Sequence, residues 1–264
     1  MRSRQQLKEE MELHLNNDIR LYAMNADELM DEELYKRALE AVSPKRREKA
    51  GRLRFEKDRR LSLAAGILTR FVFENHFGIS WEEVKLSENE YGKPFFEGGE
   101  SICHNLSHSG NMVICAAGPV PVGCDIEEIK ESRTNVSEKF FAQSEKKFVR
   151  ENGADGFFRI WTLKESYMKA VGMGLSLPMK DFSVCPAKNG EIIFSHDAGL
   201  NEEITIPPQA GGKYIFKEFS CFPGYKCACA AQTGGRDLKI EDEVCTVSAC
   251  RVLDSFSEAE DSCI

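Results

Sequence analysis

The chain has 264 residues, of which 42% are hydrophobic and 30% are charged, and its formal net charge is −8. A chain of this length can bury one large apolar core or two smaller ones. No apolar run in it approaches the roughly 18 residues that a membrane-spanning helix needs, so we expect no integral membrane protein. The net negative charge argues against general nucleic-acid binding, which depends on a basic surface.

The N-terminal residues and the cysteines favour a cytoplasmic protein. Residues 1–15 alternate charged residues with single apolar ones, whereas a secretory signal needs a continuous apolar segment. The ten cysteines are scattered and form no CxxC pair. A chain of this size does not need disulfides for stability, so we expect reduced thiols that pack as small hydrophobic groups. Cys227 and Cys229 alternate with alanines, which places both on one face of a strand.

The first half of the chain alternates strand and helix signals. Residues 19–24 predict a strand, and residues 28–42 predict a helix that ends before a Ser-Pro pair. Apolar residues at helical spacing predict an amphipathic helix over 61–76, with basic residues on its leading end. Two strands are then expected at 102–107 and 112–117, and the polar residues between them would form the tip of a β-hairpin.

The second half continues with mixed signals. Residues 122–126 predict a strand, and residues 137–151 and 157–171 predict two helices. The last predicted strand covers 225–231. The tail beyond Gly234 is acidic and weakly patterned, so we expect its end to be mobile.

A concentrated basic segment runs from Lys45 to Arg60. It holds nine lysines and arginines against three acidic residues, a local charge of +6, while the rest of the chain carries −8 − 6 = −14. Such a contrast predicts a local site for an anion. A solvated basic helix face is the alternative.

The segment GCDIEEI at 123–129 places two carboxylates on one face of a predicted strand. Alternation points Gly123, Asp125 and Glu127 to one side and the residues between them to the other. Two such carboxylates, about 7 Å apart along the backbone, can supply oxygen ligands to Mg²⁺, which also takes waters and substrate phosphates. A solvated acidic strand end would have the same sequence.

The predicted helix at 157–171 carries a second charged pair. Glu165 and Lys169 lie one turn apart, away from the apolar stripe of this helix. They can act together on a ligand. The alternative is an ordinary exposed pair, which contributes only about 0.2–0.5 kcal/mol at this spacing.

Two turns carry further polar groups. Lys93 lies between Gly92, which permits close approach by a ligand, and Pro94, which fixes the backbone. Ser107 and His108 are expected beside the hairpin tip, where they can donate hydrogen bonds to a phosphate or titrate. Ordinary surface turns would look identical.

Taken in order, these motifs resemble the phosphopantetheinyl transferases of the large, Sfp-type class. The resemblance covers roughly residues 18–235. It rests on SPKRREK at 43–49, EYGKPFF at 90–96, HNLSHSG at 104–110, VGCDIEEI at 122–129 and FFRIWTLKESYMKAVGMGLSLP at 157–178. The signatures Gly-x-Asp-(Ile/Val)-Glu and (Phe/Trp)-x-x-(Lys/Leu)-Glu-(Ser/Ala)-x-x-Lys, in that order, are specific to this family, and the chain departs from neither at the acidic positions.

The resemblance implies an α+β fold, in the form of a pseudo-dimer of two similar α+β halves with the active site in the cleft between them. The residues from Gly118 to Pro121 are typical of a connector, so we place the boundary between 1–118 and 119–264. The N-terminal half then holds the basic segment and both turns. The C-terminal half holds the acidic strand, the helix with Glu165, and the acidic tail.

The resemblance also implies a metal site and its chemistry. Asp125, Glu127 and Glu165 would hold Mg²⁺ against the pyrophosphate of coenzyme A, and Lys169 would add a second cation there. Glu165 and Lys169 are the expected catalytic residues. The general base for the attacking hydroxyl would be Glu165 or a metal-bound water.

Further positions match the contacts that the family makes with coenzyme A. The matches to the pyrophosphate and adenosine phosphate contacts are Gly92, Lys93, Pro94, Ser107 and His108. The matches to the basic cluster around the 3'-phosphate are Arg46, Lys49 and Arg60, with Arg59 as the alternative to Arg60.

The implied activity is transfer of 4'-phosphopantetheine from coenzyme A to a serine of an apo acyl or peptidyl carrier protein, with release of 3',5'-ADP. We expect a monomer. A Mg²⁺-dependent phosphoesterase acting on CoA-like nucleotides would use the same carboxylates but transfer to water. A non-catalytic carrier-protein or CoA-binding module is disfavoured, because the acidic residues and Lys169 are all present.

Overall fold

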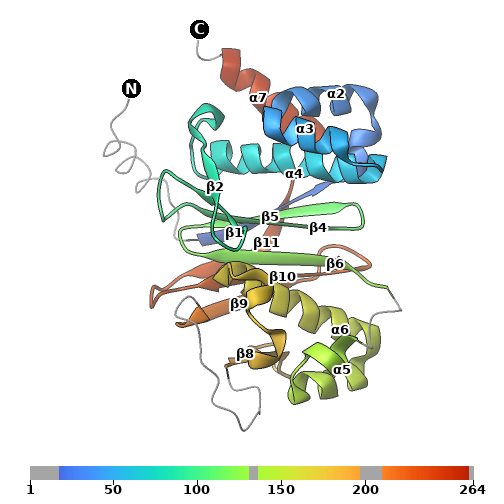
Figure 1. Cartoon of the computed structure of the whole chain (residues 1–264), viewed down its shortest axis with the longest axis vertical. Helices are drawn as coiled ribbons and strands as arrows, with labels where there is room; N and C mark the ends of the chain where they lie inside the picture. The colour runs from blue at the N-terminus through green and yellow to red at the C-terminus, as the bar shows by residue number, and fades with distance from the viewer. Residues whose placement is uncertain (1–17, 131–135, 197–209, 262–264) are drawn as a thin grey trace.

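The computed structural model describes residues 18–130, 136–196 and 210–261 (Figure 1). The helices are α2 (Glu32–Ala41), α3 (Pro44–Arg52), α4 (Glu56–Asn75), α5 (Ser137–Phe140), α6 (Gln143–Val171) and α7 (Ala249–Asp261), with 3₁₀ helices η1 (Ala26–Met30), η2 (Trp81–Glu83), η4 (Gly174–Ser176) and η5 (Met179–Asp181). The strands are β1 (Asp18–Asn25), β2 (Leu86–Glu88), β3 (Pro94–Phe96), β4 (Cys103–Ser109), β5 (Met112–Gly118), β6 (Val122–Glu128), β7 (Ser183–Pro186), β8 (Ile192–Ser195), β9 (Tyr214–Phe219), β10 (Tyr225–Gln232) and β11 (Lys239–Thr246). The α+β class expected from the sequence is confirmed.

Two sheets form the middle of the molecule. The first has the strand order β11-β1-β5-β4, and the second has the order β6-β10-β9. Strands β4 and β6 join them, since the backbone N–H of Cys124 donates to the side-chain oxygen of Asn105 at 2.9 Å. Helices α2, α3, α4 and α7 lie on one side of the strands, and α5 and α6 lie on the other (Figure 1).

Strand alternation explains this layering. In β1 and β5, Met24 and Val113 pack toward α4, whereas Leu21 and Ile114 pack toward the second sheet. The second sheet meets them with the apolar side of β6 and with Cys227 and Cys229 of β10. Its opposite face lies against α6. The predicted single face for the two cysteines is therefore confirmed.

Two predicted helices are divided in the structure. The helix expected over 28–42 is split at Asp31, whose carboxylate accepts the N–H groups of Glu33 and Leu34 and begins α2. The helix expected over 137–151 is split after Phe140, and α6 then runs through both predicted helices, with a kink at Gly153. The backbone there has φ 61°, which glycine adopts without strain.

The basic segment also folds differently from the expectation. We expected its basic residues on the leading end of the helix over 61–76, but the first half of the segment, residues 45–52, lies in the separate helix α3. Ser43 caps that helix by accepting the N–H of Arg46 at 3.3 Å, and Pro44 occupies its first position. The following helix α4 begins at Glu56.

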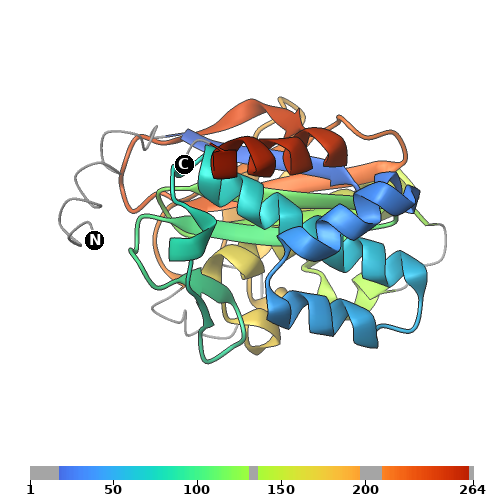
Figure 2. The same ribbon diagram turned by 90° about the horizontal axis from the view of Figure 1, so that it is seen from above.

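The chain beyond Gly234 forms β11 and α7, although its sequence is weakly patterned. The last residues, 262–264, at the end that we expected to be mobile, lie outside the described part of the chain. Strand β11 pairs in parallel with β1. Helix α7 lies beside α4 (Figure 2), and Arg70 stacks on Phe256 at 4.0 Å. The pattern of β11 is weak because it is an edge strand in which only Ile240 is buried. Strand β11 and helix α7 thus pack against the first half of the chain. The division of the chain into 1–118 and 119–264 and the pseudo-dimer of two similar halves stay predictions.

No helix in the described parts of the chain has the length and apolar character to cross a membrane. The cysteines that the structure describes are all free thiols.

A fully buried ion pair anchors α6. The ammonium of Lys164 lies 2.6 Å from Glu145 and 2.7 Å from the carbonyl of Phe182. Glu145 also accepts the N–H groups of Ala142 at 2.8 Å and Val184 at 2.7 Å. Burial lowers the pKa of Lys164 to about 8, although the Glu145 charge opposes that shift. The pair thus joins the start of α6 to its second half and to the start of β7.

Lys164→Met should destabilise the fold by about 3–5 kcal/mol, because it leaves the Glu145 charge buried without its partner. Chemical denaturation measures this difference. Lys147→Met is the matched control, since Lys147 forms an exposed pair with Glu151, and it should cost less than about 1 kcal/mol. Equal losses in the two variants would contradict the anchoring role.

Candidate active site

A cavity of 390 Å³ lies where β4, β6 and α6 meet. Its lining residues are Leu106, Ser107 and His108 of β4, Asp125 and Glu127 of β6, and Trp161, Glu165 and Lys169 of α6. Three segments that the sequence separates therefore contribute to one site. All the predicted metal ligands line this cavity, as do both residues of the hairpin.

The periodicities of β6 and α6 aim these side chains. In β6, Cys124 and Ile126 enter the core between the sheets, so Asp125 and Glu127 point to the other side, toward α6. In α6, Glu165 and Lys169 share a face one turn apart. The predicted shared faces are confirmed for both elements.

Gly123 sets how closely β6 approaches α6. A Cβ atom at this position would lie less than 3.0 Å from main-chain atoms of Ser166 and Ala170. Only a residue without a side chain allows this approach. The two elements that carry the acidic groups therefore touch through their backbones.

Asp125 lies at the centre of the polar contacts. Its side chain is 6% exposed, and Oδ1 lies 2.6 Å from the ammonium of Lys169 and accepts the hydroxyl of Ser107 at 2.8 Å. Lys169 also donates to Ser107 Oγ at 2.9 Å and to the carbonyl of Cys124 at 3.2 Å. Lys169 therefore forms its ion pair with Asp125 on the neighbouring strand. This differs from the alternative, an ordinary exposed pair of Glu165 and Lys169 on one helix.

The second oxygen of Asp125, Oδ2, is buried and has no hydrogen-bond partner among the described residues. Such an atom is costly unless something pairs with it. A cation in the cavity would supply that partner. The donor set, which consists of carboxylates, also has the chemistry that Mg²⁺ prefers.

Ser109 is a site residue that sequence reasoning missed. Its hydroxyl donates to Glu127 at 2.9 Å and accepts the N–H of Glu128 at 3.1 Å. The predicted strand ended at Ser107, but β4 continues to Ser109, so strand alternation places both serines on one face. Trp161 was also missed, and its ring stacks on Phe157 at a centroid distance of 5.7 Å.

The charges in the cavity shift the pKa values of its groups. Burial, together with the charges of Asp125 and Glu127, raises the pKa of Glu165 to about 7. Burial is the largest influence on Lys169 and would lower its pKa, but the charge and hydrogen bond of Asp125 act together with the neighbouring Cys124 and Glu165, and the pKa is raised. Burial and the charge of Lys169 lower the pKa of His108, which favours the neutral imidazole. The carboxylates therefore repel one another in a way that a bound cation would relieve.

The described residues contain no group of three acidic, His or Cys side chains arranged as a complete metal site. The three-ligand Mg²⁺ site therefore stays a prediction, supported by the unpaired oxygen and the mutual repulsion.

Lys93 does not line the cavity. Its ammonium donates to the carbonyls of Val122 at 3.1 Å and Ala170 at 3.0 Å, and burial lowers its pKa to about 8. The flanking Gly92 and Pro94 are exposed. The predicted contact of this turn with coenzyme A stays a prediction.

The basic residues lie on α3 and the start of α4, outside the cavity wall. Arg46 makes a long contact of 3.5 Å with the carbonyl of Ser62, while Lys49 is exposed. Arg60 pairs with Asp27 at 3.5 Å. The charges of Asp58 and Lys49 shift the pKa of His108 in opposite directions, so residues of the basic segment lie within electrostatic reach of the β4 side of the cavity.

Arg59 donates to the carbonyl of Leu53 at 2.8 Å, so both it and Arg60 have partners within the protein. The structure does not distinguish them as ligands of a phosphate.

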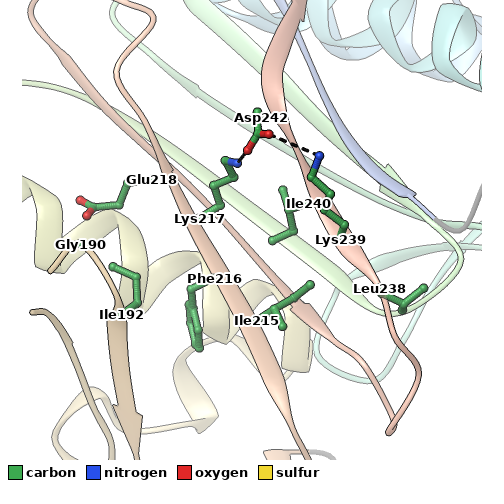
Figure 3. A pocket seen from close by; sticks show the side chains of 10 residues that line it. All are labelled: Gly190, Ile192, Ile215, Phe216, Lys217, Glu218, Leu238, Lys239, Ile240 and Asp242. Atoms are coloured by element: carbon green, nitrogen blue, oxygen red, sulfur yellow. Dashed lines mark hydrogen bonds and ion pairs between the residues drawn. The ribbon is translucent and has the colours of Figure 1, made fainter.

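A second hollow, of 500 Å³, lies on β9 and β11 (Figure 3). Its lysines, Lys217 and Lys239, both pair with Asp242. No predicted site residue lines it. We therefore assign the chemistry to the smaller cavity.

Comparison with known proteins agrees with this site. A family model described as "4'-phosphopantetheinyl transferase superfamily" matches residues 121–230, and one described as "4'-phosphopantetheinyl transferase, N-terminal" matches residues 30–120. The chain is 32% identical over 218 residues to the 4'-phosphopantetheinyl transferase Sfp of Bacillus subtilis (strain 168), covering 81% of this chain and 92% of that protein. The chain belongs to the 4'-phosphopantetheinyl transferase superfamily. The Sfp-type resemblance is confirmed.

Other proteins similar to this transferase come from other organisms. The 4'-phosphopantetheinyl transferase gsp of Aneurinibacillus migulanus is 34% identical, covering 66% of this chain and 70% of its own. The L-aminoadipate-semialdehyde dehydrogenase-phosphopantetheinyl transferase of Xenopus laevis is 30% identical, covering 55% of each chain. Among solved structures, the holo-[acyl-carrier-protein] synthase of Helicobacter pylori in complex with coenzyme A matches at 18% identity and TM-score 0.31, covering 42% of this chain and 97% of that chain.

Gly123→Ala should lower transferase activity by about 100-fold, because the added methyl group pushes β6 from α6 and misplaces the cavity side chains. It should also cost about 1–3 kcal/mol of stability, measured by denaturation. The control is Gly51→Ala, since nothing lies within 4 Å of a Cβ at that exposed helical position. That variant should keep activity within about twofold and gain about 0.5–1 kcal/mol. Full activity in Gly123→Ala would refute the close-contact argument.

Proposed function

We propose that this transferase moves the 4'-phosphopantetheine of coenzyme A to a serine hydroxyl of an apo acyl or peptidyl carrier protein, releasing 3',5'-ADP, and that it requires Mg²⁺. The observation that carries the proposal is the cavity in which Asp125, held by Lys169 and Ser107, faces the same space as Glu127 and Glu165. The monomeric state and cytoplasmic location expected from the sequence belong to the same proposal.

The metal would be held by Asp125, Glu127 and Glu165. The unpaired Oδ2 of Asp125 supports this assignment, because a cation would pair with it. The pKa of Glu165, raised first by burial and then by the charge of Asp125, supports it too, because a cation would stabilise the ionised carboxylate. A bound Mg²⁺ would stabilise the negative charge that develops on the leaving 3',5'-ADP.

The protein's own groups orient the reacting phosphate. Lys169 keeps its charge because Asp125 raises its pKa, so it can balance a phosphate while remaining fixed on α6. Ser107 holds Asp125, and Ser109 holds Glu127, so β4 fixes the rotamers of both acidic side chains of β6. Such fixed groups need little reorganisation during the reaction.

The transfer reaction is tested by incubating several apo carrier proteins with coenzyme A, Mg²⁺ and the enzyme. Intact mass measurement should show covalent gain of the phosphopantetheine group on a carrier, with 3',5'-ADP in solution. Unmodified carriers with hydrolysed coenzyme A would identify a phosphoesterase instead. Binding of coenzyme A without any product would identify a non-catalytic module.

Asp125→Asn should reduce transfer by about 10²–10³-fold, because it removes the charge that pairs with Lys169 and the proposed metal. The measurement is a Mg²⁺ titration of the transfer rate, with circular dichroism as the check on folding. Glu128→Gln is the matched control on the same strand, since Glu128 pairs with Lys130 outside the cavity. Its rate should stay within about twofold of wild type. Wild-type turnover by Asp125→Asn at limiting Mg²⁺ would exclude this metal assignment.

Arg46 and Lys49 are proposed to bind the 3'-phosphate of coenzyme A. Replacing both with alanine should raise the Michaelis constant for coenzyme A by about 10- to 150-fold per lost contact, the equivalent of about 1.5–3 kcal/mol each. The use of dephospho-CoA should barely change, because that substrate has no 3'-phosphate. Steady-state kinetics with both substrates makes the comparison.

The control for net charge is the double variant Lys36→Ala and Lys188→Ala, which removes two exposed lysines elsewhere. It should leave both Michaelis constants unchanged. Equal weakening toward both substrates in the Arg46/Lys49 variant would reject the 3'-phosphate assignment.

A further inference from the structure

The turn from Asn89 to Lys93 belongs to the first half of the chain, but its side chains reach the end of α6. The turn is held by its own asparagine, since Asn89 Oδ1 accepts the N–H of Tyr91 at 3.0 Å and that of Lys93 at 2.8 Å. The N–H of Asn89 in turn donates to the carbonyl of Lys93 at 3.0 Å. The position of Lys93 is therefore fixed within a tight loop between β2 and β3.

Two side chains of this loop, those of Asn89 and Lys93, donate hydrogen bonds to main-chain carbonyls of the second half of the chain. The ammonium of Lys93 donates to Val122, the first residue of β6, and to Ala170 near the end of α6. The amide of Asn89 donates to the carbonyl of Gly172 at 2.9 Å. The last carbonyls of a helix lack partners within the helix and carry partial negative charge. Here the ammonium of Lys93 and the side-chain amide of Asn89 donate hydrogen bonds to these carbonyls.

This loop joins the same two elements as the ion pair of the active site. Ala170 directly follows Lys169, and Val122 is adjacent to Gly123, where β6 and α6 touch. At Gly172 the helix ends with φ 81°, and a Cβ there would lie 2.8 Å from Cδ of Lys93. The absence of a side chain at Gly172 therefore leaves room for the side chain of Lys93.

We propose that Lys93 is a positioning residue, whose ammonium ties the start of β6 to the end of α6 and thereby fixes Lys169 against Asp125, and that it does not contact the phosphates of coenzyme A. The kinetic part of the test rests on the proposed transferase reaction. The contact itself rests on the geometry of the loop.

Steady-state kinetics separates the two roles of Lys93. Lys93→Met should lower kcat by about tenfold or more and leave the Michaelis constant for coenzyme A within about threefold, because a loosened β6–α6 contact misplaces groups that act in the transition state. A phosphate contact predicts the reverse, a Michaelis constant raised by about tenfold with kcat retained. That reverse result would overturn the proposal.

Asn89→Ala provides an independent test, since the asparagine carries no charge that could bind a phosphate. It should show the same pattern as Lys93→Met, a lower kcat with an unchanged Michaelis constant. Lys85→Met is the matched control, because Lys85 is an exposed lysine before the same loop. Both of its kinetic constants should equal those of the wild type. A wild-type kcat in Asn89→Ala would contradict the positioning role of the loop.

Hydrogen–deuterium exchange tests the contact of Asn89 and Lys93 with the end of α6 without any catalytic readout. Peptides that cover the end of α6 should exchange about tenfold faster in Lys93→Met and Asn89→Ala, while peptides from α4 keep the wild-type rate. Unchanged exchange at α6, or faster exchange throughout the molecule, would overturn the proposal. If the wild-type enzyme modifies no carrier, the proposed function fails. The exchange result still shows whether the loop with Asn89 and Lys93 stabilises the end of α6.

Discussion

The arrangement of the site depends on the direct backbone contact between β6 and α6. Gly123 allows it, because any side chain at that position would meet the main chain of the helix. Close contact brings Asp125 of the strand within 2.6 Å of Lys169 of the helix. Glu127 and Glu165 then face the same cavity, because side chains alternate along β6 and return to the same face after each turn of α6. A single position without a side chain thus sets the distance between the groups that form the cavity.

Around this contact, buried polar interactions fix the direction of α6. Lys164, one residue before Glu165, turns away from the cavity and forms a fully buried pair with Glu145. Neighbouring residues of the helix therefore serve different purposes: one anchors it in the protein interior, and the next points its carboxylate into the site. Burying a charge is expensive unless it is paired, so such a pair resists rotation of the helix.

The two sheets cooperate through contacts between distant parts of the chain. Asn105 joins β4 to β6, and the serines of β4 hold the carboxylates of β6. The loop with Asn89 and Lys93 reaches from the first half to the end of α6. The C-terminal strand and helix return to the first half and cover its sheet edge and helices. The site is consequently shared between segments that could not form it alone.

The sequence by itself determined the α+β class, the strands β1, β4, β5, β6 and β10, and the shared faces of Asp125 with Glu127 and of Glu165 with Lys169. These features follow from local periodicity, which the chain carries in every window of a few residues. Ser109 escaped that reasoning, because the predicted strand ended at Ser107 whereas β4 continues to Ser109 and places both serines on one face. The motifs likewise identified the family before any fold was known.

Only the tertiary structure decided which groups meet across elements. The partner of Lys169 is Asp125 rather than Glu165, and the partners of Lys93 are main-chain carbonyls, which have no sequence signature. The edge strand β11 escaped prediction because its exposed charges obscure the alternation, and its place beside β1 depends on a pairing across most of the chain. Periodicity specifies the direction of a side chain on its own element, whereas the contact it makes depends on elements packed against it from elsewhere.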